Sequence, residues 1–279
     1  MVLILWASVV GFAQTTFYLA HVANGVQGPS VVWKTTILLT NPASSGTATG
    51  TITFMSESAD MSTAGVPFSG LSVTDETGAT ATGTTFTFSI PAGGIHKVTS
   101  TGTGQFAQGF AAVTTNAGSV SGSAIFSEFD GAGNLIGEAG VALLNAVTRQ
   151  AIFVDTVGNY KIGIAYANPG SSSANITLNL LNSSGNTVGA PVNQVLGPGN
   201  HTAVFTFQSS MFPSASPMTG TIQITSDSPL AVTALRFDPT LTKFTTLPPV
   251  TLDAGTGSAN TGSTDGNTGS TGGGYGNYY

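Results

Sequence analysis

Cysteine is absent from the 279 residues of the chain. This absence excludes disulfides, thiolate nucleophiles and metal sites with cysteine ligands. It does not exclude export from the cell, because domains of about 100 residues or more fold without covalent cross-links. At this length the chain has room for about two domains.

Charged residues are also scarce. They make up 6% of the chain, against about 25% in an average soluble protein. The surface must therefore be covered mainly by Thr, Ser, Asn and Gln, and a weakly charged surface does little to prevent self-association. The net charge is −6 and the six basic residues are widely scattered. We expect no nucleic-acid partner, because neutralising phosphates needs clustered Lys and Arg.

Long apolar runs are missing except at the start of the chain. Residues 1–13, MVLILWASVVGFA, are apolar and end in small residues before Gln14. The run resembles a signal peptide with its cleavage site, and the alternative is a first β-strand of the folded domain. The run is too short to cross a bilayer as a helix, and no other segment comes close. We therefore expect no membrane span and a secreted protein, located outside the cell or at its surface.

Helical periodicity is nearly absent, and apolar residues alternate with polar ones instead. Thr85–Ile90 (TFTFSI) and Thr219–Thr225 (TGTIQIT) are examples. Short runs rich in β-branched and aromatic residues, bounded by Gly, Pro, Asn and Ser, indicate strands. Their spacing of roughly ten residues favours sandwiches or barrels over alternating strands and helices.

Two distant segments share one pattern. Residues 33–42 read WKTTILLTNP and residues 160–169 read YKIGIAYANP. Each has an aromatic residue, a lysine, an apolar run and Asn-Pro, which should end a strand because proline cannot continue a central ladder. Further matches follow in the same order, up to residues 109–130 and 220–238. The preserved order indicates an internal duplication.

The duplication predicts two domains, with residues 14–149 as the first repeat and residues 150–252 as the second. Residues 253–279 are rich in Gly, Ser and Thr and have almost no aliphatic side chains, so we expect a flexible low-complexity tail. Insertions at Gly25–Val32 and Ala59–Gly83 lengthen the first repeat. Insertions in a β scaffold form loops, where binding residues are often found, so we expect any ligand surface on the first repeat.

The chain has three histidines, His21, His96 and His201. His96 and His201 both follow Gly-rich turns, at positions that become equivalent when the repeats are aligned. This equivalence favours a structural role in each turn over one shared catalytic site. Neither an HExxH nor a GxSxG motif is present, so we predict no catalytic residues, no metal centre and no cofactor.

Acidic residues are weak candidates for binding sites. Asp130 begins DGAGN, which partly resembles a calcium loop but lacks the third acidic ligand. The same residues suit a hairpin turn that needs no metal. Asp75 and Glu76 lie in the second insertion and are candidate ligand-binding residues. The alternative is that they are exposed loop acids that serve solubility.

Trp33 begins its strand directly after the first insertion. Aromatic residues at alternate strand positions share a face and usually point to the core, so we expect Trp33 in the core or at its edge. The alternative is a platform on which a sugar ring stacks.

The pattern aromatic-Lys-Thr-Thr-Ile-x-Leu-x-Asn-Pro, with PLAVTALRF at residues 229–237, resembles tandem repeats of uncharacterised exported bacterial surface proteins. The resemblance covers residues 17–54 and 109–130 of the first repeat and residues 153–181 and 220–250 of the second. It implies an all-β fold of two tandem immunoglobulin-like β-sandwich domains. It brings no catalytic residues.

Composition, duplication and resemblance together suggest a function. The leading hypothesis is a non-enzymatic structural or adhesive protein, a subunit of a surface polymer or filament. Its partners would be copies of itself or other components of the cell surface, since exposed strand edges invite pairing between chains. The alternative is a carbohydrate-binding module that uses Trp33 and the loops of the first repeat, with a glycan as its partner.

Overall fold

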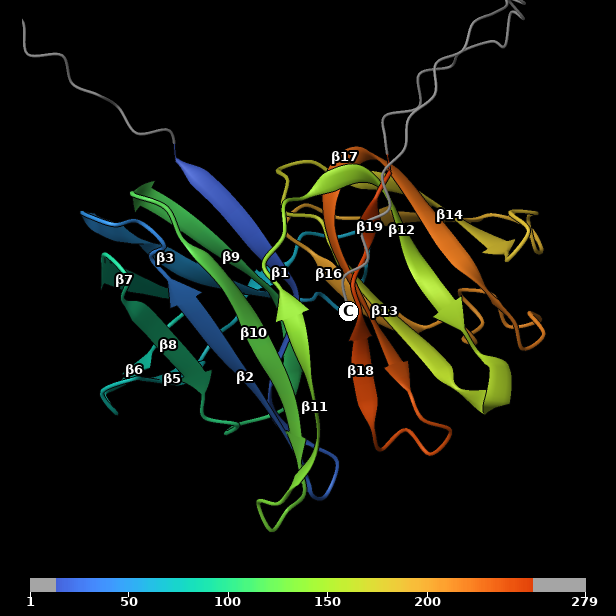
Figure 1. The fold of residues 1–279 in the computed structure, drawn as a ribbon. Helices are drawn as coiled ribbons and strands as arrows, with labels where there is room; N and C mark the ends of the chain where they lie inside the picture. Colours follow the sequence, from blue (N-terminus) through green and yellow to red (C-terminus); the bar gives the residue numbers. More distant parts are fainter. Residues whose placement is uncertain (1–13, 253–279) are drawn as a thin grey trace, which may run out of the picture.

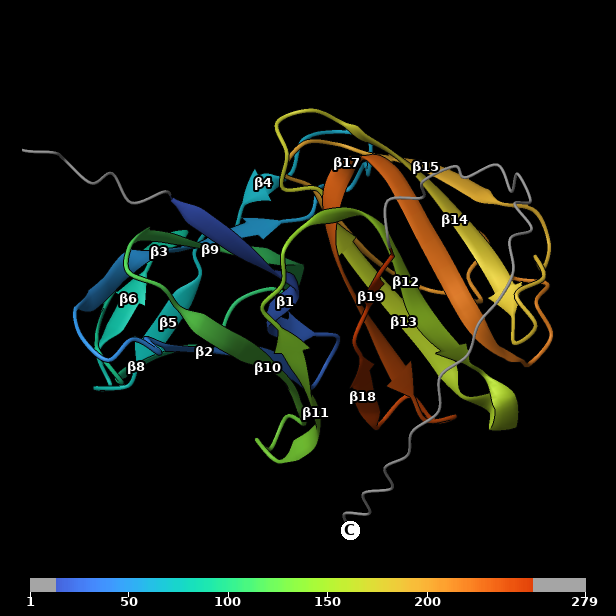
Figure 2. The same ribbon diagram turned by 45° about the horizontal axis from the view of Figure 1, so that its top comes forward.

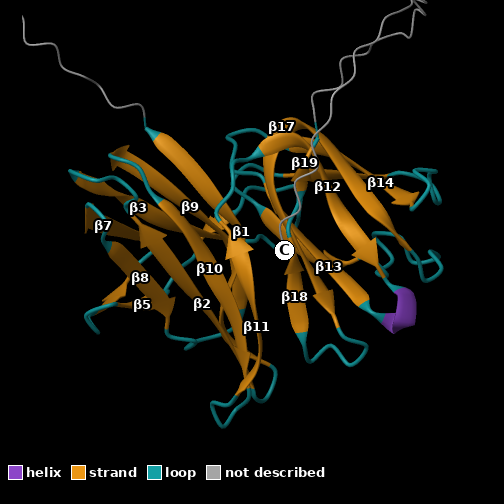
Figure 3. Ribbon diagram, in the orientation of Figure 1, coloured by secondary structure: helices purple, strands orange, loops and turns teal. Residues whose placement is uncertain are grey.

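The computed structural model describes residues 14–252, and within them the protein is all-β (Figure 3). The predicted signal peptide and tail lie outside these residues. Every pairing between the described strands is antiparallel. Within the described part of the chain, no helix has the length and apolarity that crossing a bilayer requires.

The first half of the structure contains eleven strands, coloured blue to green in Figure 1. They are β1 (Thr15–Gln27), β2 (Val31–Thr40), β3 (Thr47–Ser56), β4 (Val66–Pro67), β5 (Ser72–Asp75), β6 (Thr80–Thr82), β7 (Thr85–Pro91), β8 (Ile95–Ser100), β9 (Ala107–Ala117), β10 (Ser121–Phe129) and β11 (Leu135–Ala142).

The second half contains eight strands, coloured from yellow-green to red. They are β12 (Val147–Asp155), β13 (Lys161–Ala167), β14 (Ala174–Asn182), β15 (Val192–Leu196), β16 (His201–Phe205), β17 (Thr219–Phe237), β18 (Phe244–Leu247) and β19 (Val250–Thr251), with a single 3-10 turn, η1 (Val157–Asn159), before β13.

The first half forms two layers around one core. One layer runs β7-β3-β9-β1, and the other runs β11-β10-β2-β8-β5-β6. Strand β1 joins them, because residues 15–24 pair with β9 while residues 25–27 pair with β2. Alternation along the strands directs one set of side chains inward, as Phe86, Phe88 and Ile90 of β7 show. The result is a sandwich-like arrangement.

The second half repeats this plan with the long strand β17. Residues 219–226 of β17 pair with β12 and β14, and residues 231–237 pair with β13. Figure 2 shows β17 bending from one layer into the other. The second core lies between these layers, with Ile164, Tyr166, Leu178 and Ile222 among its fully buried residues.

The layer β16-β13-β17-β18 has a buried face on each side. Its alternate residues Ile164, Val232 and Ala234 belong to the second core, whereas Leu235 and Phe237 belong to the core of the first half. Phe244 of β18 joins the first core as well. The two halves are therefore packed against each other through this layer rather than joined only by the chain between them.

The Asn-Pro pair ends the equivalent strands β2 and β13, as predicted. Asn41 and Asn168 are buried, and the side-chain amide nitrogen of each donates to a backbone carbonyl near the end of another strand. Asn41 donates to Ile90 O of β7 and Asn168 to Leu196 O of β15, each at 3.0 Å. The side-chain oxygen of each accepts the backbone N–H two residues later. Because both copies place the same amide in the same position, the signature marks a turn that each repeat builds in the same way.

Replacing Asn168 with Ala should lower the free energy of unfolding by about 1–3 kcal/mol, because buried carbonyl groups lose their donor. Chemical denaturation measures this. Asn186→Ala, in an exposed turn, is the control and should change stability by less than about 0.5 kcal/mol. Equal effects of the two substitutions would contradict the assigned role of Asn168.

Candidate functional site

A cavity of about 400 Å³ lies between the two halves of the structure. Strands β1, β2, β9 and β10 contribute its lining from the first half, and β13, β16 and β17 from the second. The lining residues are His21, Gln27, Trp33, Phe106, Gln108, Phe126, Glu128, Gly163, Ile164, Ala165, Ala203, Val204, Phe205, Gln208, Thr233, Leu235, Phe237 and Leu241. Its size is within the usual range for small-molecule sites, about 300–1,000 Å³.

The cavity exists because small residues occupy the middle of a sheet face that is otherwise bulky. Gly163 is opposite both Phe205 and Leu235, and Ala165 is opposite Ala203. Directly opposed residues of antiparallel strands point to the same side of the sheet. Small side chains at the centre, with larger ones beside them, leave a hollow that faces the first half.

Aromatic rings form a continuous cluster from one half to the other. Trp33 stacks on Phe126 with 4.6 Å between ring centroids, and Phe126 lies 5.7 Å from Phe244. Phe244 lies 5.1 Å from Phe237, which in turn contacts Phe205 at 5.2 Å. Ring pairs at these separations contribute about 0.5–1.5 kcal/mol each beyond the area they bury, so the cluster helps to hold the halves together.

Trp33 lies in the wall of the cavity and is 9% exposed. Its indole N–H donates to Gln27 Oε1 at 2.8 Å, and one ring face is stacked on Phe126. This placement agrees with the expectation of a residue at the edge of the core. A ring this deeply buried is not an open platform, so a ligand can reach Trp33 only by entering the cavity.

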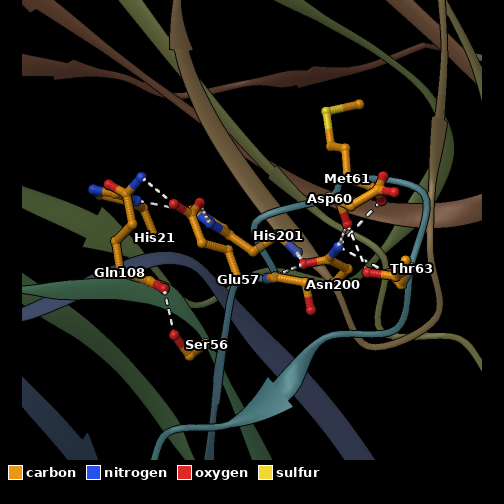
Figure 4. A network of polar contacts seen from close by, with 10 residues as sticks. His21, Ser56, Glu57, Asp60, Met61, Thr63, Gln108, Asn200 and His201 are labelled. Atoms are coloured by element: carbon orange, nitrogen blue, oxygen red, sulfur yellow. Dashed lines mark hydrogen bonds and ion pairs between the residues drawn. The ribbon is translucent and has the colours of Figure 1, made fainter.

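A chain of polar contacts crosses between the halves beside the cavity (Figure 4). Nδ1 of His21 lies 3.3 Å from Nε2 of His201, and Nδ1 of His201 lies 3.2 Å from Glu57 Oε2. Gln108 Nε2 donates to the other carboxylate oxygen of Glu57 at 2.8 Å. Since a carboxylate only accepts, His201 Nδ1 is the donor to Glu57, which fixes the orientation of the His201 ring.

A β-bulge brings His21 into this chain. Leu19 pairs with Ala111 and Val22 pairs with Gly109, so two residues of β1 face a single residue of β9 at this point. Bulges redirect side chains in this way. The bulge does not show in the sequence pattern, and His21 therefore could not be placed from the sequence.

Burial lowers the pKa of His21 to about 3, and repulsion from His201 adds to the effect. His21 is therefore neutral at ordinary pH, with a ring that serves hydrogen bonding. A group with this pKa is a weak general base near pH 7. The contacts of His21 thus suit a structural or ligand-contacting role better than proton transfer.

The expected equivalence of His96 and His201 is wrong by one residue. His201 is opposite Ala167, which directly precedes Asn168. In the first half the residue before Asn41 is opposite Ile95, and His96 is one position further along. Because strand faces alternate, the two histidines point to opposite sides of their sheets. His96 contacts Glu76 instead, at 3.0 Å.

Part of the second insertion forms a strap that contacts the second half. Asn200 is fully buried, and its side-chain amide donates to the backbone carbonyls of Asp60, Met61 and Thr63. Its side-chain oxygen accepts the N–H of Ser58 at 2.9 Å. We call residues 57–65 the strap. The sequence predicted a binding loop in this insertion, whereas these residues bind the other half of the same chain.

The strap also requires glycine at its closest approach. A Cβ atom on Gly65 would lie 1.9 Å from the carbonyl oxygen of Gly199, and one on Gly197 would lie 1.8 Å from that of Thr63. The backbone of the strap and the turn before β16 are thus in direct contact. Gly65 N–H also donates to Pro198 O at 3.0 Å.

The predicted acidic candidates Asp75, Glu76 and Asp130 do not line the cavity. Asp75 accepts from Thr77 and Ala79 within its own turn, and Glu76 accepts from Lys97 N–H at 2.9 Å. These bonds lower the pKa of both carboxyl groups. The two residues therefore hold their own turn and strand end together.

The carboxylate of Asp130 likewise accepts hydrogen bonds from its own turn. Its Oδ1 accepts the N–H groups of Ala132 and Asn134, and its Oδ2 accepts from the Asn134 side chain. These bonds lower the pKa of Asp130, chiefly through Asn134. In the second half Asp238 accepts from Thr242 and Lys243 in the same manner. Within residues 14–252, no group of three or more His, Asp or Glu side chains is close enough to hold a metal ion.

Comparisons of the chain with protein-family models, with curated proteins and with solved structures found no match.

Replacing His21 with Gln should weaken the dependence of stability on pH. The unfolded chain protonates His21 below about pH 6.5, whereas the folded chain keeps it neutral to about pH 3. The unfolded state then binds more protons, so stability is greatest above about pH 6.5 and falls as the pH drops. The substitution should remove a slope that rises to about 1.4 kcal/mol per pH unit well below pH 6.5, measured by urea unfolding at about pH 7, 6 and 5. His96→Gln is the control and should keep the slope.

Replacing Asn200 with Ala should lower the free energy of unfolding by about 2–3 kcal/mol, because three strap carbonyls lose their donor. Hydrogen exchange should quicken at Gly65 N–H, because its bond to Pro198 O forms only while the strap is held in place. Asn200→Asp keeps an acceptor for Ser58 but replaces the donor, so it should destabilise at least as much as Ala. Unchanged exchange at Gly65 in both variants would show that Asn200 does not hold the strap.

Proposed function

We propose that the chain is a non-enzymatic protein of the cell exterior with a structural or adhesive role, assembling with copies of itself or with other surface components. In this proposal its two halves are immunoglobulin-like sandwiches that act as one rigid unit. Support comes from the duplicated plan of the halves and from the strap and aromatic cluster that fasten them together.

The observation that carries the proposal is an uncharged sheet with an open edge. Strands β1, β3, β7 and β9 contain no Asp, Glu, Lys or Arg. Their outward residues are mainly threonines, in rows such as Thr87, Thr51, Thr114 and Thr16, which follow one another across the four strands. Such a surface has hydroxyl groups for contact with a partner and little charge to repel a second copy.

The edge of this sheet is strand β7, which pairs only with β3 among the described strands. Phe54 N–H bonds Thr84 O at 2.8 Å, and hydrogen-bonded pairs alternate along an antiparallel ladder. The N–H groups of Thr85, Thr87 and Ser89 therefore point away from β3. Natural edges are usually protected by charged residues, by proline or by bulges, and β7 has no charged residue, while its one proline, Pro91, lies at the end of the strand.

We expect the protein to self-associate in a concentration-dependent manner and Thr87→Lys to weaken this association up to about fivefold. The reason is that like charges on facing strands cost up to about 1 kcal/mol per pair. Sedimentation velocity measures the effect. Ser171→Lys adds the same charge in an exposed turn of the second half and is the matched control. A chain that stays monomeric at high concentration, or equal effects of both substitutions, would count against assembly through β7.

Carbohydrate binding through Trp33 is the weaker alternative. Trp33 is buried with one ring face stacked on Phe126, and Asp75 and Glu76 are engaged in their own turn. A glycan would have to enter the cavity between the halves. Saturable binding on a glycan array, lost when Ala203→Leu fills the floor of the cavity, would support this alternative.

A further inference from the structure

Glu128 occupies a position that normally belongs to a core residue. On β10 it follows the buried residues Ala124 and Phe126 at the same two-residue interval, so the three side chains share one face. It is directly opposite Trp33 on β2, whose side chain is buried on that face. The strand pattern thus points a carboxylate toward the interior, at the place where the interior opens into the cavity.

Glu128 has no hydrogen-bond or ion-pair partner within residues 14–252. Three pairs of a basic and an acidic side chain lie within ion-pair distance in the described chain, and Glu128 belongs to none of them. The neighbouring Lys34 sits over the ring of Phe129, on the other face of the sheet. Burial raises the pKa of Glu128. A half-buried carboxylate without a partner costs stability, so its presence calls for an explanation.

The rest of the cavity lining is uncharged and rich in aromatic rings. Besides Glu128, the polar lining residues are three glutamines, Thr233 and His21, which is neutral because burial lowers its pKa to about 3. The lining contains neither Lys nor Arg. Five aromatic residues, Trp33, Phe106, Phe126, Phe205 and Phe237, complete the wall. A single negative charge among aromatic rings favours a positively charged guest, since the faces of such rings attract cations.

We propose that the cavity binds an organic cation, an ammonium group attached to an apolar body, with Glu128 as its counter-charge. The ammonium group pairs with the Glu128 carboxylate, and the apolar body fills the hollow above Gly163, Ala165 and Ala203. The volume of about 400 Å³ suits a small molecule. The lining residues Gln27, Gln208 and Leu241 are exposed, so the cavity opens to solvent on their side. This site is independent of the proposed self-association through β7.

The test uses two probes of nearly the same shape, choline and its uncharged analogue 3,3-dimethylbutan-1-ol, with benzyltrimethylammonium as a larger cation. Calorimetric titration gives the affinities, and the fluorescence of Trp33 reports occupancy of the cavity. Both cations should bind, and choline should bind about tenfold or more tightly than its uncharged analogue. Equal affinities for choline and the analogue, or no binding of either cation, would overturn the proposal.

Three variants locate the binding. Glu128→Gln should weaken cation binding about tenfold while leaving binding of the uncharged analogue unchanged, and its melting temperature should not fall, because an unpaired carboxylate is removed. Glu138→Gln, on the adjacent strand with its carboxylate bonded to Ser127, is the matched control and should bind as the unaltered chain does. Ala203→Leu should abolish binding of the two cations and of the uncharged analogue.

Two outcomes separate the cation from other guests. If Glu128→Gln keeps the full affinity for cations, the Glu128 carboxylate does not pair with the ammonium group and the proposal fails. If a neutral oligosaccharide binds in the cavity and displaces benzyltrimethylammonium, while Glu128→Gln does not change its affinity, the site belongs to a glycan instead.

Discussion

Burial of both faces of the layer β16-β13-β17-β18 is the constraint on which the rest of the structure depends. An ordinary two-layer domain buries one face of each sheet and leaves the other to water. Here the outer face bears Phe205, Leu235 and Phe237, which would be a large exposed apolar patch in an isolated domain. The first half covers this patch, and the strap and the contacts between His21, His201 and Glu57 form around it.

The two halves of the structure differ where they meet. Where the second copy has Gly163 and Ala165 on β13, the equivalent strand β2 has Thr36 and Leu38 facing outward. Asn200, which holds the strap, corresponds to Gly94, since the backbone carbonyl of each accepts the N–H of the signature asparagine. The interface thus lies at positions where the corresponding strands of the two halves carry different residues.

Alternation, Gly-rich turns and the ordered repeat were enough to predict an all-β chain and the equivalence of β2 with β13. These signals are local, because alternation of apolar and polar residues within a few positions shows which side chains of a strand point to the core. The interface escaped prediction since it depends on contacts across long stretches of chain, such as His21 with His201. The one-residue error at His96 has the same cause, because sequence matching alone does not determine register. Trp33 was placed correctly at the edge of the core, while Glu128 was overlooked because single charges on strands usually face water.

Strand β17 carries a consequence for the order of events during synthesis. The core of the first half includes Leu235, Phe237 and Phe244, which are made more than ninety residues after β11 ends. Until those residues emerge, Trp33 and Phe126 lack the side chains that cover them, and the first half has an unfinished core. The core of the first half therefore cannot be completed until nearly the whole described part of the chain has been synthesised.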